Sequence, residues 1–291
     1  MAVADVELLE PDAEFQPRQG TYWLGRSRST GSALLIKTGL RQQEVEWTVA
    51  LARSAPHLVP RYHGWGSNFP GLGEATGLFV IQERVPFTLS AEFERYHESV
   101  AEAGIAFGAA APAAGLPMEP FFTQDEIAVA IEGAMTFAVP GPADAILRLL
   151  PEHWAWVTAL CPTVACHGDL HPGNVLTRTL PPGPARETLL IGFAPRLAPW
   201  VFEPAWPTIR HAFNVAALAR PNLIDATAAV RQRRGLPSAA GADLERLQSI
   251  VLAWYALDSW GRLEDGLRRA DPARRSMVQE LCRRAVSTRP F

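Results

Sequence analysis

The chain contains almost no lysine. Its 27 Lys and Arg residues include one lysine, Lys37, and all the others are arginines. Alanine and proline are also abundant, and this composition is typical of a protein from a GC-rich genome. A lysine that is kept against such a bias calls for a reason. We therefore treat Lys37 as a candidate functional residue.

Cysteine is scarce as well. Cys161, Cys166 and Cys282 are an odd number of thiols without the spacing of metal ligands. This favours reduced cysteines, and we expect a cytoplasmic protein. The N-terminal residues lack a positive region followed by an apolar core, so we expect no secretory signal. The longest apolar candidate, residues 101–116, is interrupted and too short to cross a bilayer, so we expect no membrane partner.

An excess of positive charge is also lacking. The formal net charge is -3, which gives no electrostatic support for a nucleic-acid partner. The 291 residues are 48% hydrophobic and 20% charged, as in soluble globular proteins. A chain of this length is long enough for two lobes that share a cleft.

The most specific motif is CHGDLHPGNVL at residues 166–176. Asp169 and Asn174 have four residues between them, on a loop that leads into an apolar strand. In phosphoryl transfer, a carboxylate must reach the attacking hydroxyl, and an amide oxygen can hold a phosphate-bound metal. In an alternative interpretation, His167 is a buried structural imidazole and Asp169 only forms a turn. We interpret His171 as a loop residue.

This motif closely resembles the catalytic loop of the aminoglycoside phosphotransferase and choline kinase family. The resemblance implies an α+β, bilobal, protein-kinase-like fold. Its small β-rich N-lobe would comprise residues 1–86, and its larger, mostly helical C-lobe residues 87–291. The resemblance also implies ATP or GTP and Mg²⁺ as cofactors, with Asp169 as the catalytic residue and Asn174 as a metal ligand.

The N-terminal region has the order of elements that this family uses. Residues 21–25 and 32–37 predict a hairpin, residues 40–53 a helix and residues 77–83 a further strand. The resemblance implies that Lys37 contacts the α- and β-phosphates and is held by a helix carboxylate. We expect this carboxylate to be Glu44, with Glu46 as the alternative. A lone lysine at a strand end is otherwise usually a solvated surface charge.

Other nucleotide contacts are implied by the same resemblance. The segment 16–21 would cover the phosphates, although it offers one glycine, Gly20, where protein kinases have a glycine-rich run. The base would bind main-chain groups around Gln82, Glu83 and Arg84, where the strand runs into an interlobe hinge.

The remainder of the chain is mostly helical by pattern. Residues 124–137, 143–160 and 244–270 predict helices, and residues 188–191 a strand. The Ala-, Gly- and Pro-rich residues 104–120 predict an insert or a mobile connection.

Acidic residues of the last predicted helix are candidates for binding the acceptor. In aminoglycoside-directed relatives, acidic groups from such helices bind cationic substrates, which implies this role for Asp258 and Glu264. The alternative is that both residues belong to a water-facing helix surface.

Two positions depart from the family pattern. Family members place an Asp, a magnesium ligand, directly after the strand where this chain has Gly192, and the Asp that braces the catalytic loop corresponds to Asn214. Gly192 could be an engineered substitution. It could also be natural, with Glu203, Glu187 or water completing the metal site, or it could mark a pseudokinase.

From these patterns we expect an ATP-dependent phosphotransferase that moves the γ-phosphoryl group to a hydroxyl. The acceptor would be a small molecule, such as an antibiotic or metabolite, or a peptide Ser or Thr within a biosynthetic complex with a partner enzyme subunit. The alternative is a catalytically impaired pseudokinase that acts as a peptide- or protein-binding or scaffolding subunit.

Overall fold

The computed structural model describes residues 3–11, 21–72, 77–85, 93–137, 142–179, 186–211, 222–262 and 272–287. By their contacts, the residues group into two compact units. The first unit comprises Met1–Ala91, Ala106–Pro117 and His167–Ala194, and the second comprises Glu92–Ile105, Met118–Cys166 and Pro195–Phe291. The lobe boundary at residue 86 stays a prediction, and by contacts the catalytic-loop segment groups with the N-terminal residues.

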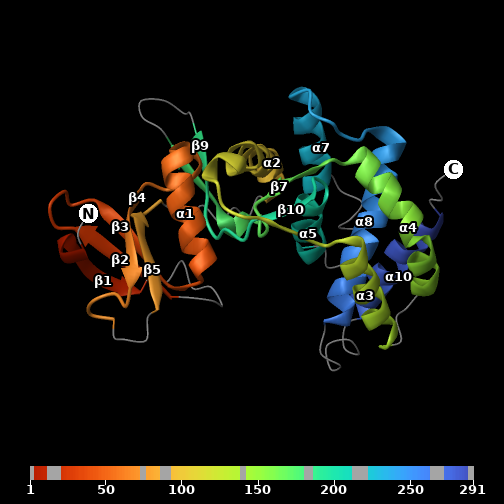
Figure 1. The fold of residues 1–291 in the computed structure, drawn as a ribbon, viewed down its shortest axis with the longest axis horizontal. Coiled ribbons are helices and arrows are strands. Elements are labelled where there is room, and N and C mark those ends of the chain that lie inside the picture. The colour runs from red at the N-terminus through yellow and green to blue at the C-terminus, as the bar shows by residue number, and fades with distance from the viewer. Residues whose placement is uncertain are drawn as a thin grey trace. The chain divides into compact units, whose positions relative to one another are not determined.

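The first unit contains an antiparallel five-stranded sheet (Figure 1). Its strands lie in the order β1-β2-β3-β5-β4. Their bounds are β1 Val6–Pro11, β2 Thr21–Ser27, β3 Ala33–Leu40, β4 Tyr62–Ser67 and β5 Leu78–Glu83. The hairpin predicted for residues 21–37 is β2 and β3. Strand β4 was not predicted from the sequence, because its two glycines are unfavourable in strands.

The turn between β2 and β3 depends on a glycine. The amide of Gly31 donates a hydrogen bond to the Ser27 carbonyl oxygen over 2.8 Å, and Gly31 has a φ of +72°. This left-handed conformation suits glycine, which has no Cβ to clash with its own backbone. In the register of these two strands, Tyr22 lies opposite Lys37.

Helix α1 (Gln42–Ser54) follows β3 directly, close to the predicted bounds of residues 40–53. Its Val45 packs with Leu40 and Val80 in an apolar cluster that joins the helix to the sheet. Because Val45 is buried against the sheet, its neighbour Glu44 in the helix can reach β3.

A second hairpin, β8 (Val175–Thr179) and β9 (Arg186–Leu190), completes the core of the first unit. The register pairs Val175 with Leu190, so the chain that enters β8 and the chain that leaves β9 meet at one end of the hairpin. The residues that join this hairpin to the large sheet form one buried cluster: Tyr22, Leu35, Val85, Leu176, Leu189 and Ile191.

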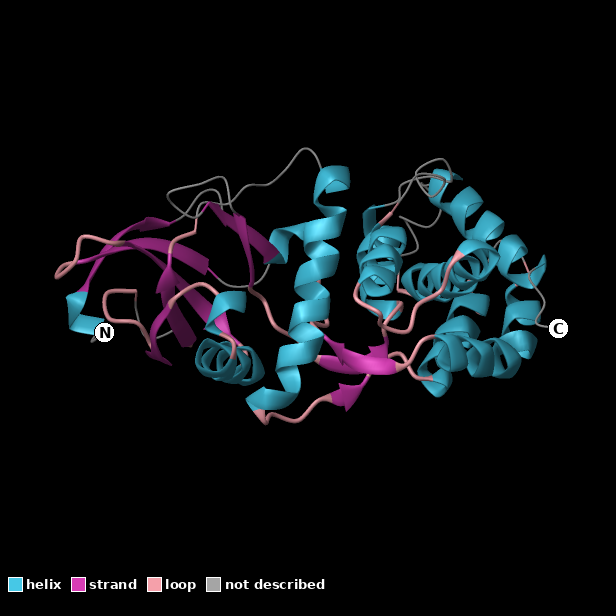
Figure 2. Cartoon of the chain, turned by 90° about the horizontal axis from the view of Figure 1, so that it is seen from above, coloured by secondary structure: helices cyan, strands magenta, loops and turns pink. Residues whose placement is uncertain are grey.

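Helices make up most of the second unit (Figure 2). Their bounds are α3 Gln124–Met135, α4 Ala143–Leu160, α5 Phe202–His211, α7 Leu223–Arg233, α8 Gly241–Gly261 and α10 Pro272–Ser287. A short sheet in the order β6-β10-β7 has the strands β6 Glu119–Pro120, β7 Thr163–Cys166 and β10 Arg196–Pro199. Helix α8 is the core element, with residues such as Trp254 and Leu257 fully buried. None of the described helices is long and apolar enough to span a membrane.

The prediction of an insert or mobile connection at residues 104–120 was wrong over its first part. Helix α2 runs from Phe93 to Ala110, and a short 3₁₀ helix, η4, covers Ala111–Ala114. Phe107 and Ala111 are fully buried. Small residues allow this helix to pack closely, which outweighs the low helix propensity of its glycines.

Candidate active site

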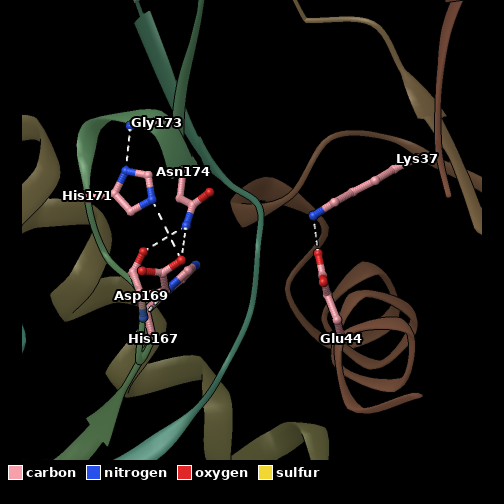
Figure 3. A network of polar contacts seen from close by, with 7 residues as sticks. All are labelled: Lys37, Glu44, His167, Asp169, His171, Gly173 and Asn174. Atoms are coloured by element: carbon pink, nitrogen blue, oxygen red, sulfur yellow. Dashed lines mark hydrogen bonds and ion pairs between the residues drawn. The ribbon is translucent and has the colours of Figure 1, made fainter. Parts of the chain in front are cut away.

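Lys37 and Glu44 form an ion pair between β3 and α1 (Figure 3). The Lys37 Nζ donates a hydrogen bond to Glu44 Oε1, and the two side chains are only 13% and 15% exposed. Glu46, the alternative partner, instead accepts a hydrogen bond of 2.8 Å from the Gln42 side chain. The structure therefore contains the pair that the sequence favoured, and Lys37 is not a solvated surface charge.

The surroundings of Lys37 keep it charged. Burial lowers the pKa of Lys37, but the interactions with Tyr22 and with the Glu44 carboxylate raise it by more, so this pKa lies above its usual value. The Tyr22 ring, placed opposite Lys37 by the strand register, has its centroid 5.4 Å from Nζ. The first unit therefore holds one fixed, largely buried positive charge at this position.

His167 is the buried anchor of the motif loop. Its ring centroid lies 4.9 Å from that of Phe193 and 5.6 Å from that of Phe107. The amide of Asp169 donates to His167 Nδ1 over 3.3 Å. Burial lowers the pKa of His167 to about 4, so the imidazole is neutral at physiological pH. For this residue, the interpretation as a structural imidazole is correct.

Asp169 is held by two neighbours from its own loop (Figure 3). Asn174 Nδ2 donates to the Asp169 main-chain oxygen over 2.8 Å and to Oδ2 over 2.9 Å. His171 Nε2 lies 3.6 Å from Oδ2, and His171 Nδ1 accepts a hydrogen bond of 3.0 Å from the Gly173 amide. His171, interpreted from the sequence as a loop residue, thus contacts the candidate site, and its place in the motif was the signal that could have indicated this.

Asp169 is an accessible, ionised carboxylate. Its side chain is 40% exposed. Burial raises the pKa of Asp169, but hydrogen bonding with His171 and Asn174 and the nearby imidazoles lower it more, so this pKa lies below its usual value. At neutral pH the group can therefore accept a hydrogen bond from a hydroxyl.

Gly192 follows β9 and lies against Asn174. Its φ is +73°, and a Cβ at this position would meet Asn174 Oδ1 at 2.7 Å and Cγ and Nδ2 at 2.9 Å each. The Ile191 amide donates to the Asn174 carbonyl oxygen over 3.0 Å, which fixes the two segments beside each other. The space that a side chain at position 192 would need is thus filled by the Asn174 amide.

The residues around Asn174 do not fit a Mg²⁺ ion held by protein ligands. Magnesium in proteins usually binds one or two carboxylates together with phosphates and water. Position 192 offers no carboxylate, and Asp169 Oδ2 already accepts from Asn174. Within the described ranges, no group of three or more His, Cys, Asp or Glu residues is arranged to hold a metal. The role of Asn174 as a metal ligand stays a prediction, which this arrangement does not favour.

Glu187 does not replace the missing carboxylate. Arg178 Nε donates to Glu187 Oε2 over 3.0 Å, and Arg178 Nη1 donates to Glu83 Oε1. In the hairpin register, Glu187 lies opposite Arg178, away from the end where Asn174 and Gly192 meet. Its carboxylate is committed to this ion-pair network.

The predicted hinge contacts have partners of their own. The amide of Glu83 donates a hydrogen bond to the Arg61 carbonyl oxygen over 2.8 Å. The amide of Arg84 donates one to the Ala33 carbonyl oxygen over 3.1 Å. Gln82 is buried in β5. A base bound at this segment would therefore use other main-chain groups, and the nucleotide contacts of Gln82 and Arg84 stay predictions.

Three predicted residues, Gly20, Asn214 and Glu264, lie outside the described ranges. Asp258 is in α8 of the second unit and is only 9% exposed. Its Oδ1 accepts from Arg262 Nε over 2.9 Å. The acceptor-binding role of Asp258 stays a prediction, and an acceptor would have to compete with Arg262. Glu203, the other candidate metal ligand, lies in α5 of the second unit.

Known structures share the fold of this chain. The aminoglycoside phosphotransferase APH(4)-Ia is 17% identical, with 99% of this chain and 96% of that chain covered and a TM-score of 0.56. An ethanolamine kinase of Plasmodium vivax is 12% identical, with 96% and 83% covered and a TM-score of 0.55. A thermostable APH(4)-Ia mutant in a ternary complex with AMP-PNP and hygromycin B is 18% identical, with 98% and 95% covered and a TM-score of 0.56.

These likenesses confirm the predicted α+β, kinase-like fold. A comparison with curated protein sequences gives no match. The model of the phosphotransferase enzyme family, APH, matches residues 28–185, which is more than half of the chain and includes both Lys37 and the motif loop. The chain therefore belongs to the APH phosphotransferase enzyme family.

Proposed function

We propose that this protein is an ATP- or GTP-dependent phosphotransferase that moves the γ-phosphoryl group to a hydroxyl of a small molecule. The observation that carries the proposal is the presence, in one compact unit, of the Lys37–Glu44 pair and the ionised, accessible Asp169. Family membership supports it. So does the APH(4)-Ia mutant structure, which holds a nucleotide analogue together with a small molecule.

In this proposal, Asp169 receives the proton of the acceptor hydroxyl. The acceptor oxygen forms a bond to the γ-phosphorus as the bond from that phosphorus to the β–γ bridging oxygen breaks. The products are the phosphorylated acceptor and the nucleoside diphosphate, and the proton leaves through Asp169. Lys37 stabilises the negative charge of the phosphates, and Glu44 fixes its position.

The further residue roles are part of the same proposal. Gly20, Gln82 and Arg84 belong to the proposed nucleotide site, and Asp258 and Glu264 to the acceptor site. The acceptor is an antibiotic or metabolite, or a peptide Ser or Thr presented with a partner enzyme subunit. We place the protein in the cytoplasm, where its three cysteines would stay reduced.

One observation favours a second candidate function. Gly192 removes the carboxylate that family members use for magnesium, and Asn174 fills its space. A chain without this ligand is suited to act as a pseudokinase that binds or scaffolds a peptide or protein.

The test is phosphoryl transfer by the purified protein from γ-labelled ATP and GTP. Acceptors would include aminoglycosides, amino alcohols, sugars and Ser- or Thr-containing peptides, and the Asp169→Asn variant is the matched control. We expect the wild type to label an acceptor and the variant to do so at a rate at least about 10²-fold lower. Nucleotide binding without transfer, together with tight peptide binding, would instead establish the pseudokinase. Absence of nucleotide binding would contradict the proposed function.

A further inference from the structure

Asn174 and Gly192 are sterically coupled. The three atoms of the Asn174 amide group lie between 2.7 and 2.9 Å from the position of a Cβ at residue 192. Their nearly equal distances mean that the amide lies flat against the glycine. Real Cβ atoms do not approach other heavy atoms this closely, so any side chain at position 192 would displace the amide.

In this position, the Asn174 amide is directed at Asp169. Its Nδ2 binds both the main-chain oxygen and the carboxylate of Asp169. The backbone of Asn174 is also fixed on both sides, because its amide donates to the His171 carbonyl oxygen over 2.8 Å and its carbonyl oxygen accepts from the Ile191 amide. The amide nitrogen therefore uses one hydrogen atom to hold the Asp169 main chain and the other to hold its carboxylate.

We propose that Asn174, seated on Gly192, is a positioning residue for Asp169, and that nucleotide binding by this chain depends little on a divalent cation. This inference rests on the proposed function. The weak dependence on a divalent cation is expected because position 192 has no carboxylate to bind magnesium and the Asn174 amide fills the space of one. Lys37, charged and paired with Glu44, is the group of the described site that meets the phosphate charge.

The first experiment needs no variant. ATP binding to the wild-type protein is measured by calorimetry with Mg²⁺ and with EDTA. We expect the two dissociation constants to agree within about threefold. Binding that requires Mg²⁺ would overturn the inference and leave the proposed function intact. If ATP binds under neither condition, the proposed function fails, and the inference fails with it.

The second experiment is a double-mutant cycle with Asn174→Ala and Gly192→Ala. We expect each substitution to lower kcat by about 10- to 100-fold, because Asp169 loses its position, while KM for ATP stays nearly constant. The double variant should be no slower than the slower single variant, because both changes remove the same contact. Additive losses, or losses confined to KM, would overturn the inference.

Strain at position 192 needs its own control. Gly31 has a φ of +72°, close to that of Gly192, but nothing lies within 4 Å of an added Cβ. Gly31→Ala therefore introduces the same backbone strain without displacing Asn174. We expect it to lower the stability of the fold as Gly192→Ala does and to leave kcat unchanged. A matching loss of kcat in Gly31→Ala would show that strain alone explains the effect.

Discussion

The first unit contains two regions that differ in how they handle charge. The Lys37–Glu44 pair is a shielded ion pair across a strand and a helix. The loop from His167 to Asn174 is held by a neutral imidazole and by amide hydrogen bonds, and Gly192 adds no charge. In the proposed function, the first region meets the phosphate charge. The second region offers no carboxylate at position 192, because the Asn174 amide fills that space.

The largest expected effect is on the loop. Asp169→Asn removes the proton acceptor, and we expect kcat to fall by about 10²- to 10⁴-fold. Nucleotide affinity, which depends on the other region, should stay within about threefold. Steady-state kinetics and calorimetry measure the two quantities. A variant that keeps wild-type kcat would exclude Asp169 as the base and remove the distinction between the regions.

The next effect concerns the ion pair. Lys37→Ala removes the fixed positive charge, and we expect ATP affinity to fall by about 10- to 100-fold, since a hydrogen bond to a charged group contributes about 1.5–3 kcal/mol. In Lys37→Arg, ATP affinity should lie between that of Lys37→Ala and that of the wild type, because a guanidinium differs from an ammonium group in shape and reach.

A matched pair of helix variants sharpens this result. Glu44→Gln should weaken ATP binding, because Lys37 loses the carboxylate that positions it. Glu46→Gln changes an exposed residue of the same helix, and we expect stability to change by less than about 0.5 kcal/mol and ATP affinity to remain as in the wild type. Equal effects of the two substitutions would contradict a specific role for Glu44.

The smallest effect is a pH dependence of stability, to which His167 of the loop contributes. The pKa of His167 is about 4 in the folded protein, below the ordinary histidine value of 6.5 that we expect in the unfolded chain. As the pH falls through 6.5, the unfolded chain gains a proton that the folded chain does not. The contribution of neutral His167 to the free energy of unfolding is therefore present above pH 6.5 and is lost towards pH 4. The free energy of unfolding falls by at most about 1.4 kcal/mol per pH unit.

Urea unfolding at several pH values tests this expectation. His167→Asn should flatten the decline between pH 6.5 and pH 4. His57→Asn removes an exposed imidazole from the same unit and should leave the decline unchanged. An equally steep decline in His167→Asn would place its cause elsewhere in the fold.

Much of the fold could be predicted from local sequence patterns. The hairpin around residues 28–32, the helix after Lys37 and the helices near residues 124–137 and 143–160 each have a clear periodicity or turn signal. β4 and the helical first part of residues 104–120 were missed, because tertiary packing stabilises them against low local propensity.

The positions of the candidate site residues could be predicted where a rare residue or a motif marks them. A single lysine at a strand end and an Asp with an Asn five positions later are strong signals. The contact between Asn174 and Gly192 could not be predicted, because it joins two loops across a hairpin and depends on a positive φ. The burial of Asp258 was also missed, since α8 is surrounded by packed elements and has no water-facing side at this residue.

The Arg178 network has a mechanical consequence. Its guanidinium joins the end of β5 to the hairpin β8–β9 through Glu83 and Glu187, beside the apolar cluster that contains Leu35 and Leu189. The strand that carries Lys37 and the hairpin that follows the Asp169 loop are therefore linked within one compact unit. We expect this link to keep the separation of Lys37 and Asp169 nearly constant when a nucleotide binds.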